Sequence, residues 1–127
     1  MPRILVVDDD PDVVEACRMV LECEGYDVAE ANNRLDGMAQ VAEVTPDLII
    51  LDVMMDQPDD GIVMAQTLRY EGNKTPILML TSVSKVIGLE LGQDDEVVPV
   101  DAFCEKPLEP ATLVRKVAEL LARGGAA

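Results

Sequence analysis

Three short apolar runs, separated by segments with helical spacing, most constrain what this chain can fold into. They are Ile4–Val7, Leu48–Leu51 and Ile77–Leu80. A fully apolar run of this length is typical of a strand that is buried on both faces, as in a parallel sheet. Parallel strands need long crossover connections, which helices usually provide. The pattern therefore predicts an α/β fold with helices on both faces of the sheet.

Five strands are predicted in total, because two weaker runs join the three apolar ones. Their expected ranges are Arg3–Val7, Asp27–Ala31, Leu48–Leu51, Ile77–Leu80 and Ala102–Cys104. Right-handed crossovers leave few topologies for five parallel strands. We predict a doubly wound, flavodoxin-like sheet with strand order 2-1-3-4-5. The ligand crevice of such a sheet lies where the first and third strands part.

Four helices are indicated by apolar residues at helical spacing. Asp10 is expected to cap the first helix, with Pro11 at its first position and Gly25 after its end. The expected apolar stripes are Val13, Cys17, Val20 and Leu21; Leu35, Met38, Ala39 and Ala42; Met64, Ala65 and Leu68; and Leu113, Val114, Val117, Leu120 and Leu121. A further short helix could lie at 83–91. We expect one domain over residues 1–123 and a flexible tail at 124–127.

The composition narrows the classes of partner. A net charge of −15 argues against nucleic acid and anionic membranes as partners, since phosphates require a basic face. The same charge favours basic protein surfaces and divalent cations. No run reaches the length of a membrane span, and Met1-Pro2-Arg3 leads directly into a strand. The chain is therefore expected to be cytoplasmic.

The cysteine and histidine content of the chain excludes several kinds of functional site. The three cysteines show no CxxC spacing, which suits a reducing compartment, and Cys17 is expected in the core because it lies on an apolar stripe. The chain has no histidine, so histidine bases and histidine metal ligands are excluded from it.

Polar side chains gather where the predicted strands end. Asp8 and Asp9 follow the first strand, Asp52 the third, Thr81 the fourth and Lys106 the fifth. Ligands of such sheets bind beyond the carboxyl ends of the strands. Clustered carboxylates repel one another unless a cation joins them, and a hard ion with oxygen ligands, above all Mg²⁺, fits there.

Four motifs at these strand ends carry a resemblance to a known family. They are Val6-Val7-Asp8-Asp9-Asp10, Leu51-Asp52-Val53-Met54-Met55, Leu80-Thr81-Ser82 and Glu105-Lys106-Pro107. With these motifs in this order, the chain resembles the receiver domains of two-component response regulators, in the single-domain, chemotaxis-receiver-like form. The resemblance implies a signal-transduction phosphoprotein that catalyses only its own phosphorylation and dephosphorylation, and is otherwise not an enzyme.

The resemblance also implies a role for each site residue. Asp52 would be the phosphoacceptor, and Asp8 and Asp9 would hold Mg²⁺ together with Asp52 and the backbone carbonyl of Met54. Thr81 would donate its hydroxyl to the phosphoryl group.

Two further residues complete the implied site. Lys106 would pair with the phosphoryl group, and its bond to Pro107 would be cis. Phe103 would be an aromatic switch residue that responds, with Thr81, to the aspartyl phosphate. The implied partners are a histidine kinase or phosphotransfer protein and an unknown downstream protein, reached by direct binding or by phosphorelay. The chain would be a monomer or a weak dimer.

The chain departs from the family pattern at two places, the loop after Asp52 and the segment between Thr81 and Lys106. Asp56 stands where a proline is usual, and Gly61 lies one residue further from Asp52 than usual. The separation of Thr81 and Lys106 is a few residues longer, with the extra residues in 92–100. Met54 and Val83 are both apolar, and neither can orient a hydrolytic water by a strong hydrogen bond. We therefore expect slow self-dephosphorylation.

Three other functions compete with this one. A receiver-like interaction module that no longer accepts phosphate is the main alternative, motivated by the unusual loop and the 92–100 segment. An aspartyl-phosphate phosphatase is less favoured, because it requires a second acid where Met54 stands. A flavin or dinucleotide binder is disfavoured because the first loop carries acids where a phosphate-binding loop needs glycines.

Overall fold

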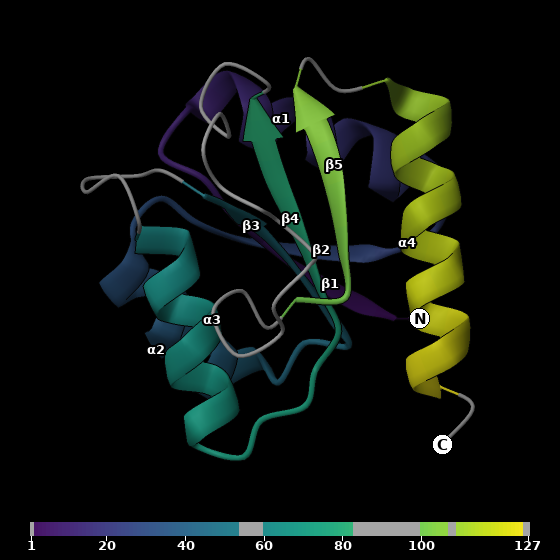
Figure 1. Ribbon diagram of the computed structural model, residues 1–127. Coiled ribbons are helices and arrows are strands. Elements are labelled where there is room, and N and C mark those ends of the chain that lie inside the picture. Colours follow the sequence, from purple (N-terminus) through teal and green to yellow (C-terminus); the bar gives the residue numbers. More distant parts are fainter. Residues whose placement is uncertain (1, 54–59, 83–99, 107–108, 126–127) are drawn as a thin grey trace.

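Five parallel strands form one sheet in the order β2-β1-β3-β4-β5 in the computed structural model (Figure 1). The structure describes residues 2–53, 60–82, 100–106 and 109–125, and for Ser82, Lys106 and 123–125 it describes the backbone alone. The elements are β1 (Arg3–Val7), α1 (Pro11–Cys23), β2 (Asp27–Ala31), α2 (Arg34–Val44), β3 (Leu48–Asp52), α3 (Asp60–Tyr70), β4 (Ile77–Ser82), β5 (Ala102–Lys106) and α4 (Pro110–Gly125). The predicted fold class and strand order are confirmed.

The helices form two layers, and the sheet separates two hydrophobic clusters. One cluster joins Leu5, Val7, Ile49 and Leu51 to residues of α2 and α3, including Val41, Met64 and Leu68. The other joins Ile4, Val6, Leu48 and Ile50 to residues of α1 and α4, including Cys17, Leu21 and Val117. Successive residues of β1 and β3 thus alternate between the two clusters, as side chains of a strand must. Both faces of these strands are covered, which explains their fully apolar sequences.

Three strands are longer than predicted. Asp52 is the last residue of β3, β4 includes Thr81 and Ser82, and β5 extends to Lys106. The ladder continues because Asp52 lies level with Leu80, and Ser82 lies level with Lys106. We expected these polar residues to follow their strands, whereas the structure places three of them at strand ends within the sheet.

The start of α1 follows its sequence signals. Asp10 has an extended backbone, and its carboxylate accepts a hydrogen bond from the backbone N–H of Asp12 at 2.9 Å. Pro11 begins the helix, where its missing N–H costs nothing. Cys17 is fully buried, as predicted. Asp10 therefore acts as the helix cap, which separates it from the neighbouring Asp8 and Asp9.

The predicted apolar stripe of α2 is confirmed at Met38, which packs against the core cluster, and is wrong at Leu35, Ala39 and Ala42, which are exposed. Leu35 is 73% exposed, and the buried residues of the helix are Gly37 and Val41. A Cβ on Gly37 would lie 3.0 Å from Val7 Cγ1 and 3.1 Å from Met64 Cε. The helix therefore approaches the sheet and α3 along the face that carries this glycine. Hydrophobicity marks this face only at Met38 and Val41, because glycine has no side chain to mark its own position.

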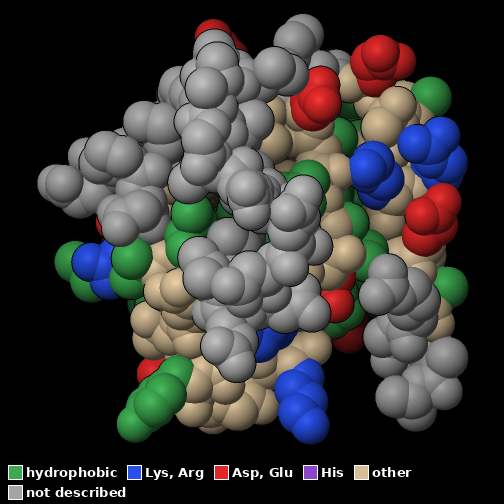
Figure 2. Space-filling view, viewed as in Figure 1, with side chains coloured by type: hydrophobic (Ala, Val, Ile, Leu, Met, Phe, Trp, Pro, Cys, Tyr) green, Lys and Arg blue, Asp and Glu red, His purple; other side chains and the backbone are tan. Residues whose placement is uncertain are grey.

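Charged side chains of both signs are interspersed over α4 (Figure 2). Arg115 Nε lies 3.9 Å from Glu119 Oε1 on this helix. The negative charge of the chain is therefore not spread evenly over its surface. Within the part of the chain that the structure describes, no helix combines the length and apolar character that a membrane crossing requires.

Two sequence predictions concern segments where the signals for secondary structure are weak. The possible helix at 83–91 lies outside the described residues. A tail was expected over 124–127, whereas α4 continues to Gly125.

Candidate functional site

Asp8 and Asp52 lie side by side at the carboxyl ends of the two central strands. Val7 of β1 pairs in register with Leu51 of β3, and each aspartate directly follows one of these residues. Asp8 N donates a hydrogen bond to Ala31 O at 3.1 Å, which holds its backbone to β2. Asp8 is fully buried and Asp52 is 6% exposed. Two carboxylates are thus held by the sheet itself at the point where β1 and β3 part.

Asp9 completes a group of three carboxylates. One carboxylate oxygen from each of Asp8, Asp9 and Asp52 lies within 4.8 Å of the other two. Asp8 Oδ1 also accepts a hydrogen bond from Asp10 N at 2.9 Å, which fixes the orientation of that carboxylate. Three oxygen donors so close together fit a hard divalent cation, which prefers carboxylate, carbonyl and water ligands. The donor set therefore suits Mg²⁺ on chemical grounds.

Thr81 stands on the next strand, one residue beyond the position level with Asp52. It is 4% exposed. Met79 of the same strand packs in the α2 and α3 cluster, and alternation places Thr81 on that same face of the sheet. Phe103 pairs in register with Met79 and packs against the same cluster. The hydroxyl and the aromatic ring expected to form a switch therefore share one face of neighbouring strands.

The remaining expected site residues are described in part or not at all. Lys106 is the last residue of β5, level with Ser82 at the same edge of the sheet, and its side chain lies outside the described residues. Met54, Asp56, Val83 and Pro107 also lie outside them.

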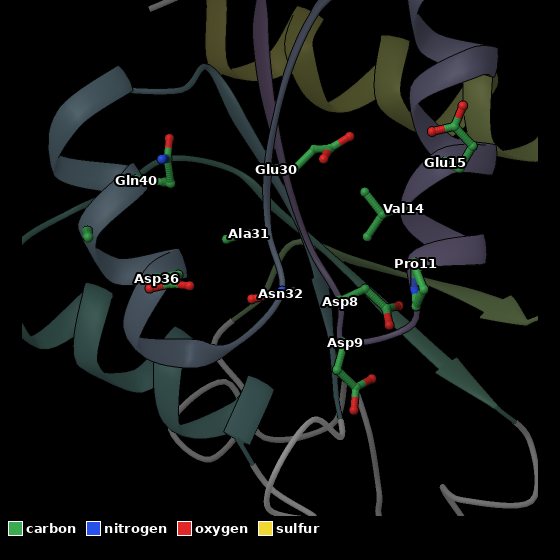
Figure 3. Close-up of a pocket in the computed structure, with 11 residues that line it drawn as sticks. Asp8, Asp9, Pro11, Val14, Glu15, Glu30, Ala31, Asn32, Asp36 and Gln40 are labelled. Atoms are coloured by element: carbon green, nitrogen blue, oxygen red, sulfur yellow. The ribbon is translucent and has the colours of Figure 1, made fainter.

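A cavity of about 700 Å³ opens beside the carboxylates, between α1 and α2 (Figure 3). Asp8 and Asp9 line it together with Glu15 of α1, Glu30 of β2 and Asp36 of α2. Arg18 pairs with Glu30 and so compensates one of these charges. The cavity shares two carboxylates with the candidate cation site but does not include Asp52 or Thr81. It therefore adjoins the site and adds to the negative potential there.

The backbone beside Asp52 is in close contact with the start of α3. Gly61 N donates a hydrogen bond to Val53 O at 2.9 Å. A Cβ on Gly61 would lie 2.8 Å from both the Asp52 carbonyl carbon and Val53 Cα, and would overlap the Asp52 carbonyl oxygen. In the sequence, only the spacing between Gly61 and Asp52 indicates that this glycine is special. Its close approach to the Asp52 backbone left no sequence signal.

An ion pair joins the first residues of α2 and α3. Arg34 Nε lies 3.2 Å from Asp60 Oδ1, and Asp60 is 5% exposed. Neither residue stood out in the sequence, because lone charges at helix starts are common. The pair places a buried, compensated carboxylate next to Gly61.

Cys104 and Phe103 connect β5 to α4. Burial raises the pKa of the Cys104 thiol, and the nearby Lys116 ammonium partly opposes that rise. Lys116 Nζ donates a hydrogen bond to Phe103 O at 2.6 Å. The backbone of the expected switch residue is therefore attached to the last helix.

Comparison with known proteins agrees with this fold and shows the family of the chain. The family model for the response regulator receiver domain matches residues 4–118. The DNA-binding response regulator MtrA of Mycolicibacterium smegmatis is 40% identical over 125 residues, which cover 95% of this chain and 51% of MtrA. RpaA of Synechocystis, described as a DNA-binding dual master transcriptional regulator, is 36% identical over 97% of this chain and 50% of its own length.

Solved structures give the same result. A putative response regulator from Chloroflexus aurantiacus has a TM-score of 0.79 and 34% identity, covering 95% of this chain and 98% of that one. The chemotaxis response regulator CheY4 of Vibrio cholerae has a TM-score of 0.81 and 27% identity, over 94% of this chain and 98% of that one. The chain belongs to the response regulator receiver domains, the signalling modules of two-component systems. It spans about half the length of the curated relatives it matches.

Proposed function

We propose that this receiver domain is phosphorylated on Asp52. The observation that carries the proposal is the group formed by Asp8, Asp9 and Asp52, whose oxygens lie within 4.8 Å of one another beside the buried Thr81. We further propose that Asp8, Asp9, Asp52 and the backbone carbonyl of Met54 bind Mg²⁺. The functional unit is proposed to span residues 1–123.

The chemistry follows from where the groups stand. An oxygen of the Asp52 carboxylate attacks the phosphorus of a donor, so that a new P–O bond forms while the bond to the donor's nitrogen or oxygen breaks. Phosphoryl transfer depends mainly on positioning and on neutralised charge. Mg²⁺, when bound, would supply part of that neutralisation. Asp8 and Asp9 would hold the cation together with Asp52, whose carboxylate would also supply the oxygen that attacks phosphorus.

Thr81 and Lys106 are proposed to act on the transferred group. The Thr81 hydroxyl donates a hydrogen bond to a phosphoryl oxygen, and the Lys106 ammonium pairs with another. Thr81 shares a sheet face with Phe103, so a movement of the hydroxyl toward the phosphate alters the packing around that ring. A local change of charge thereby reaches β5 and the last helix.

The partners are proposed at the level of their chemistry. A histidine kinase or a phosphotransfer protein is the donor expected for an aspartate acceptor in this family. The net charge of −15 favours a downstream protein with a basic surface, reached by direct contact or by phosphorelay. MtrA and RpaA are described as DNA-binding regulators and are about twice as long as this chain. Their DNA-binding role is therefore not transferred to this receiver domain.

Incubation with a small phosphodonor such as acetyl phosphate and Mg²⁺ tests the acceptor role. Intact mass spectrometry should show the gain of one phosphoryl group on the wild type and none on Asp52→Asn. Asp36→Asn is the matched control, because it removes a carboxylate of the adjoining cavity without touching the proposed acceptor. A wild type that gains no mass would favour the alternative of a phosphorylation-independent interaction module.

A further inference from the structure

The position of Asp52 depends on the start of α3 as well as on β3. Gly61 N donates a hydrogen bond to Val53 O at 2.9 Å, and a side chain on Gly61 would collide with the backbone of Asp52. Real Cβ atoms do not approach other heavy atoms as closely as the 2.8 Å that one would reach here. A displacement of the first turn of α3 would therefore be transmitted to the peptide that carries the phosphoacceptor.

The first turn of α3 is itself held by α2, which lies beside it (Figure 1). Arg34 Nε bonds Asp60 Oδ1 at 3.2 Å, and the Asp60 side chain is 7% exposed while that of Arg34 is 40% exposed. One turn further along α2, Gly37 packs against Met64 of α3. A buried carboxylate that loses its cationic partner is strongly unfavourable and tends to move toward water. Arg34 thus contributes to holding Asp60, which directly precedes Gly61, in place.

We propose that Arg34 is a positioning residue for the phosphoacceptor site, acting through Asp60 and Gly61 on the backbone of Asp52 and Val53. The inference rests on the proposed function, since it assumes that Asp52 binds the cation and accepts the phosphoryl group. Arg34 does not line the carboxylate cluster, and its effect is transmitted by contact through the start of α3.

The sign of the effect on Mg²⁺ affinity separates positioning from simple charge. Through space, the loss of a positive charge near three carboxylates would strengthen cation binding. Through contact, the loss of the ion pair would loosen the start of α3 and misplace the Asp52 oxygens, which weakens binding. The two explanations therefore predict opposite changes in the same measurement.

Isothermal titration calorimetry of Mg²⁺ with Arg34→Met tests the proposal. We expect binding that is weaker by about tenfold, at the low end of the effects seen when partners of metal ligands are removed. Amide hydrogen exchange at Gly61 should also become faster, because its bond to Val53 O is no longer held. Arg34→Lys retains the ion pair and should recover most of the affinity. Affinity that is unchanged or tighter in Arg34→Met, or not recovered by Arg34→Lys, would overturn the proposal.

Arg3→Met is the matched control. Arg3 Nε pairs with Asp27 Oδ2 at the same distance of 3.2 Å, but at the opposite edge of the sheet, so its loss should leave Mg²⁺ affinity unchanged. Arg34→Gln keeps an N–H donor but loses the charge, and it replaces Arg34→Met if that variant does not fold. A smaller weakening is then expected, and binding that is unchanged or tighter would overturn the proposal.

Measurements on the wild type distinguish a failure of the proposed function from a failure of the positioning role of Arg34. If it neither binds Mg²⁺ nor accepts a phosphoryl group on Asp52, the proposed function fails and the positioning role fails with it. If the wild type does both and Arg34→Met binds Mg²⁺ equally well, only the positioning role fails.

Discussion

Gly61 packs so closely against the backbone of Asp52 that no Cβ atom fits between them. The two residues belong to different elements, α3 and β3, and stand nine positions apart in the sequence. The contact explains why a glycine is required at 61, since its φ is not in the left-handed region that otherwise favours glycine. The requirement is steric and concerns the candidate acceptor directly.

Gly61→Ala should therefore impair the site and the fold together. The added methyl group would have to displace the backbone of Asp52 and Val53, which we expect to cost about 2 kcal/mol in the free energy of unfolding. Mg²⁺ binding and phosphoryl transfer from acetyl phosphate should fall by at least about tenfold. Chemical denaturation and calorimetry measure the two effects on one preparation.

Gly37→Ala is the control for this substitution. Its Cβ would meet side-chain atoms of Val7 and Met64 at 3.0 to 3.2 Å, and the flexible end of Met64 can give way. The change in stability should stay within about 1 kcal/mol, because the better helix propensity of alanine offsets the tight contact. A Gly61→Ala protein with wild-type Mg²⁺ affinity would contradict the steric argument.

Asp8→Asn should stabilise the protein in the absence of Mg²⁺ and abolish its stabilisation by Mg²⁺. Asp8 is fully buried beside Asp52, and removing one of the clustered carboxylate charges relieves their repulsion. The asparagine can still accept the hydrogen bond from Asp10 N through Oδ1. A gain of about 1 kcal/mol, or roughly 4 °C in Tm, is expected without the ion. Thermal unfolding with and without Mg²⁺ measures both effects.

Asp9→Asn is the comparison for Asp8→Asn, because Asp9 belongs to the same cluster but is exposed. Its charge is better solvated, so the gain in Tm without Mg²⁺ should be smaller. An Asp8→Asn protein that is less stable than the wild type without Mg²⁺ would show that repulsion does not dominate at this site.

The sheet and the carboxylate cluster could be predicted from the sequence because each rests on a strong local signal. Apolar runs such as Ile4–Val7 fix the buried strands, and parallel topology then brings the residues after Val7 and Leu51 to one edge. The Asp10 cap was equally legible, since Pro11 follows it directly. These features follow from rules that act within a few residues or within one strand pairing.

Most of the inward face of α2 and the Arg34–Asp60 pair could not be predicted in this way. Of this face of α2 only Met38 was predicted correctly, because Gly37 leaves no mark in a hydrophobicity pattern and the exposed Leu35 gave a false signal. The ion pair joins residues 26 positions apart on two helices. Its existence depends on how closely α2 and α3 pack, which only the tertiary structure determines.

The phosphorylated form should lose its phosphoryl group slowly. Met54 lies two residues after Asp52 in the sequence, and Val83 lies two residues after Thr81. Neither side chain can orient a water molecule by a strong hydrogen bond. Purified phosphoprotein mixed with Mg²⁺ should release phosphate over minutes or longer, followed by mass spectrometry or phosphate assay. Val83→Asn, which introduces a donor and an acceptor, should release it faster, whereas release from the wild type within seconds would contradict the expectation.

The thiol of Cys104 should make the protein less stable in alkaline solution. Burial raises the pKa of this thiol above its ordinary value of 9.0, so the folded chain keeps the proton that the unfolded chain loses. The stabilisation from the neutral buried thiol is complete below the unfolded pKa and is lost as the pH rises through the folded pKa. Between about pH 8 and pH 10, Tm should therefore fall more steeply in the wild type than in Cys104→Ala.

In the native protein a thiol reagent should modify the exposed Cys23 first, while Cys17 and Cys104 are protected by burial. Equal pH dependence of Tm in the two proteins, together with rapid labelling of Cys104, would show that this strand opens in the folded state.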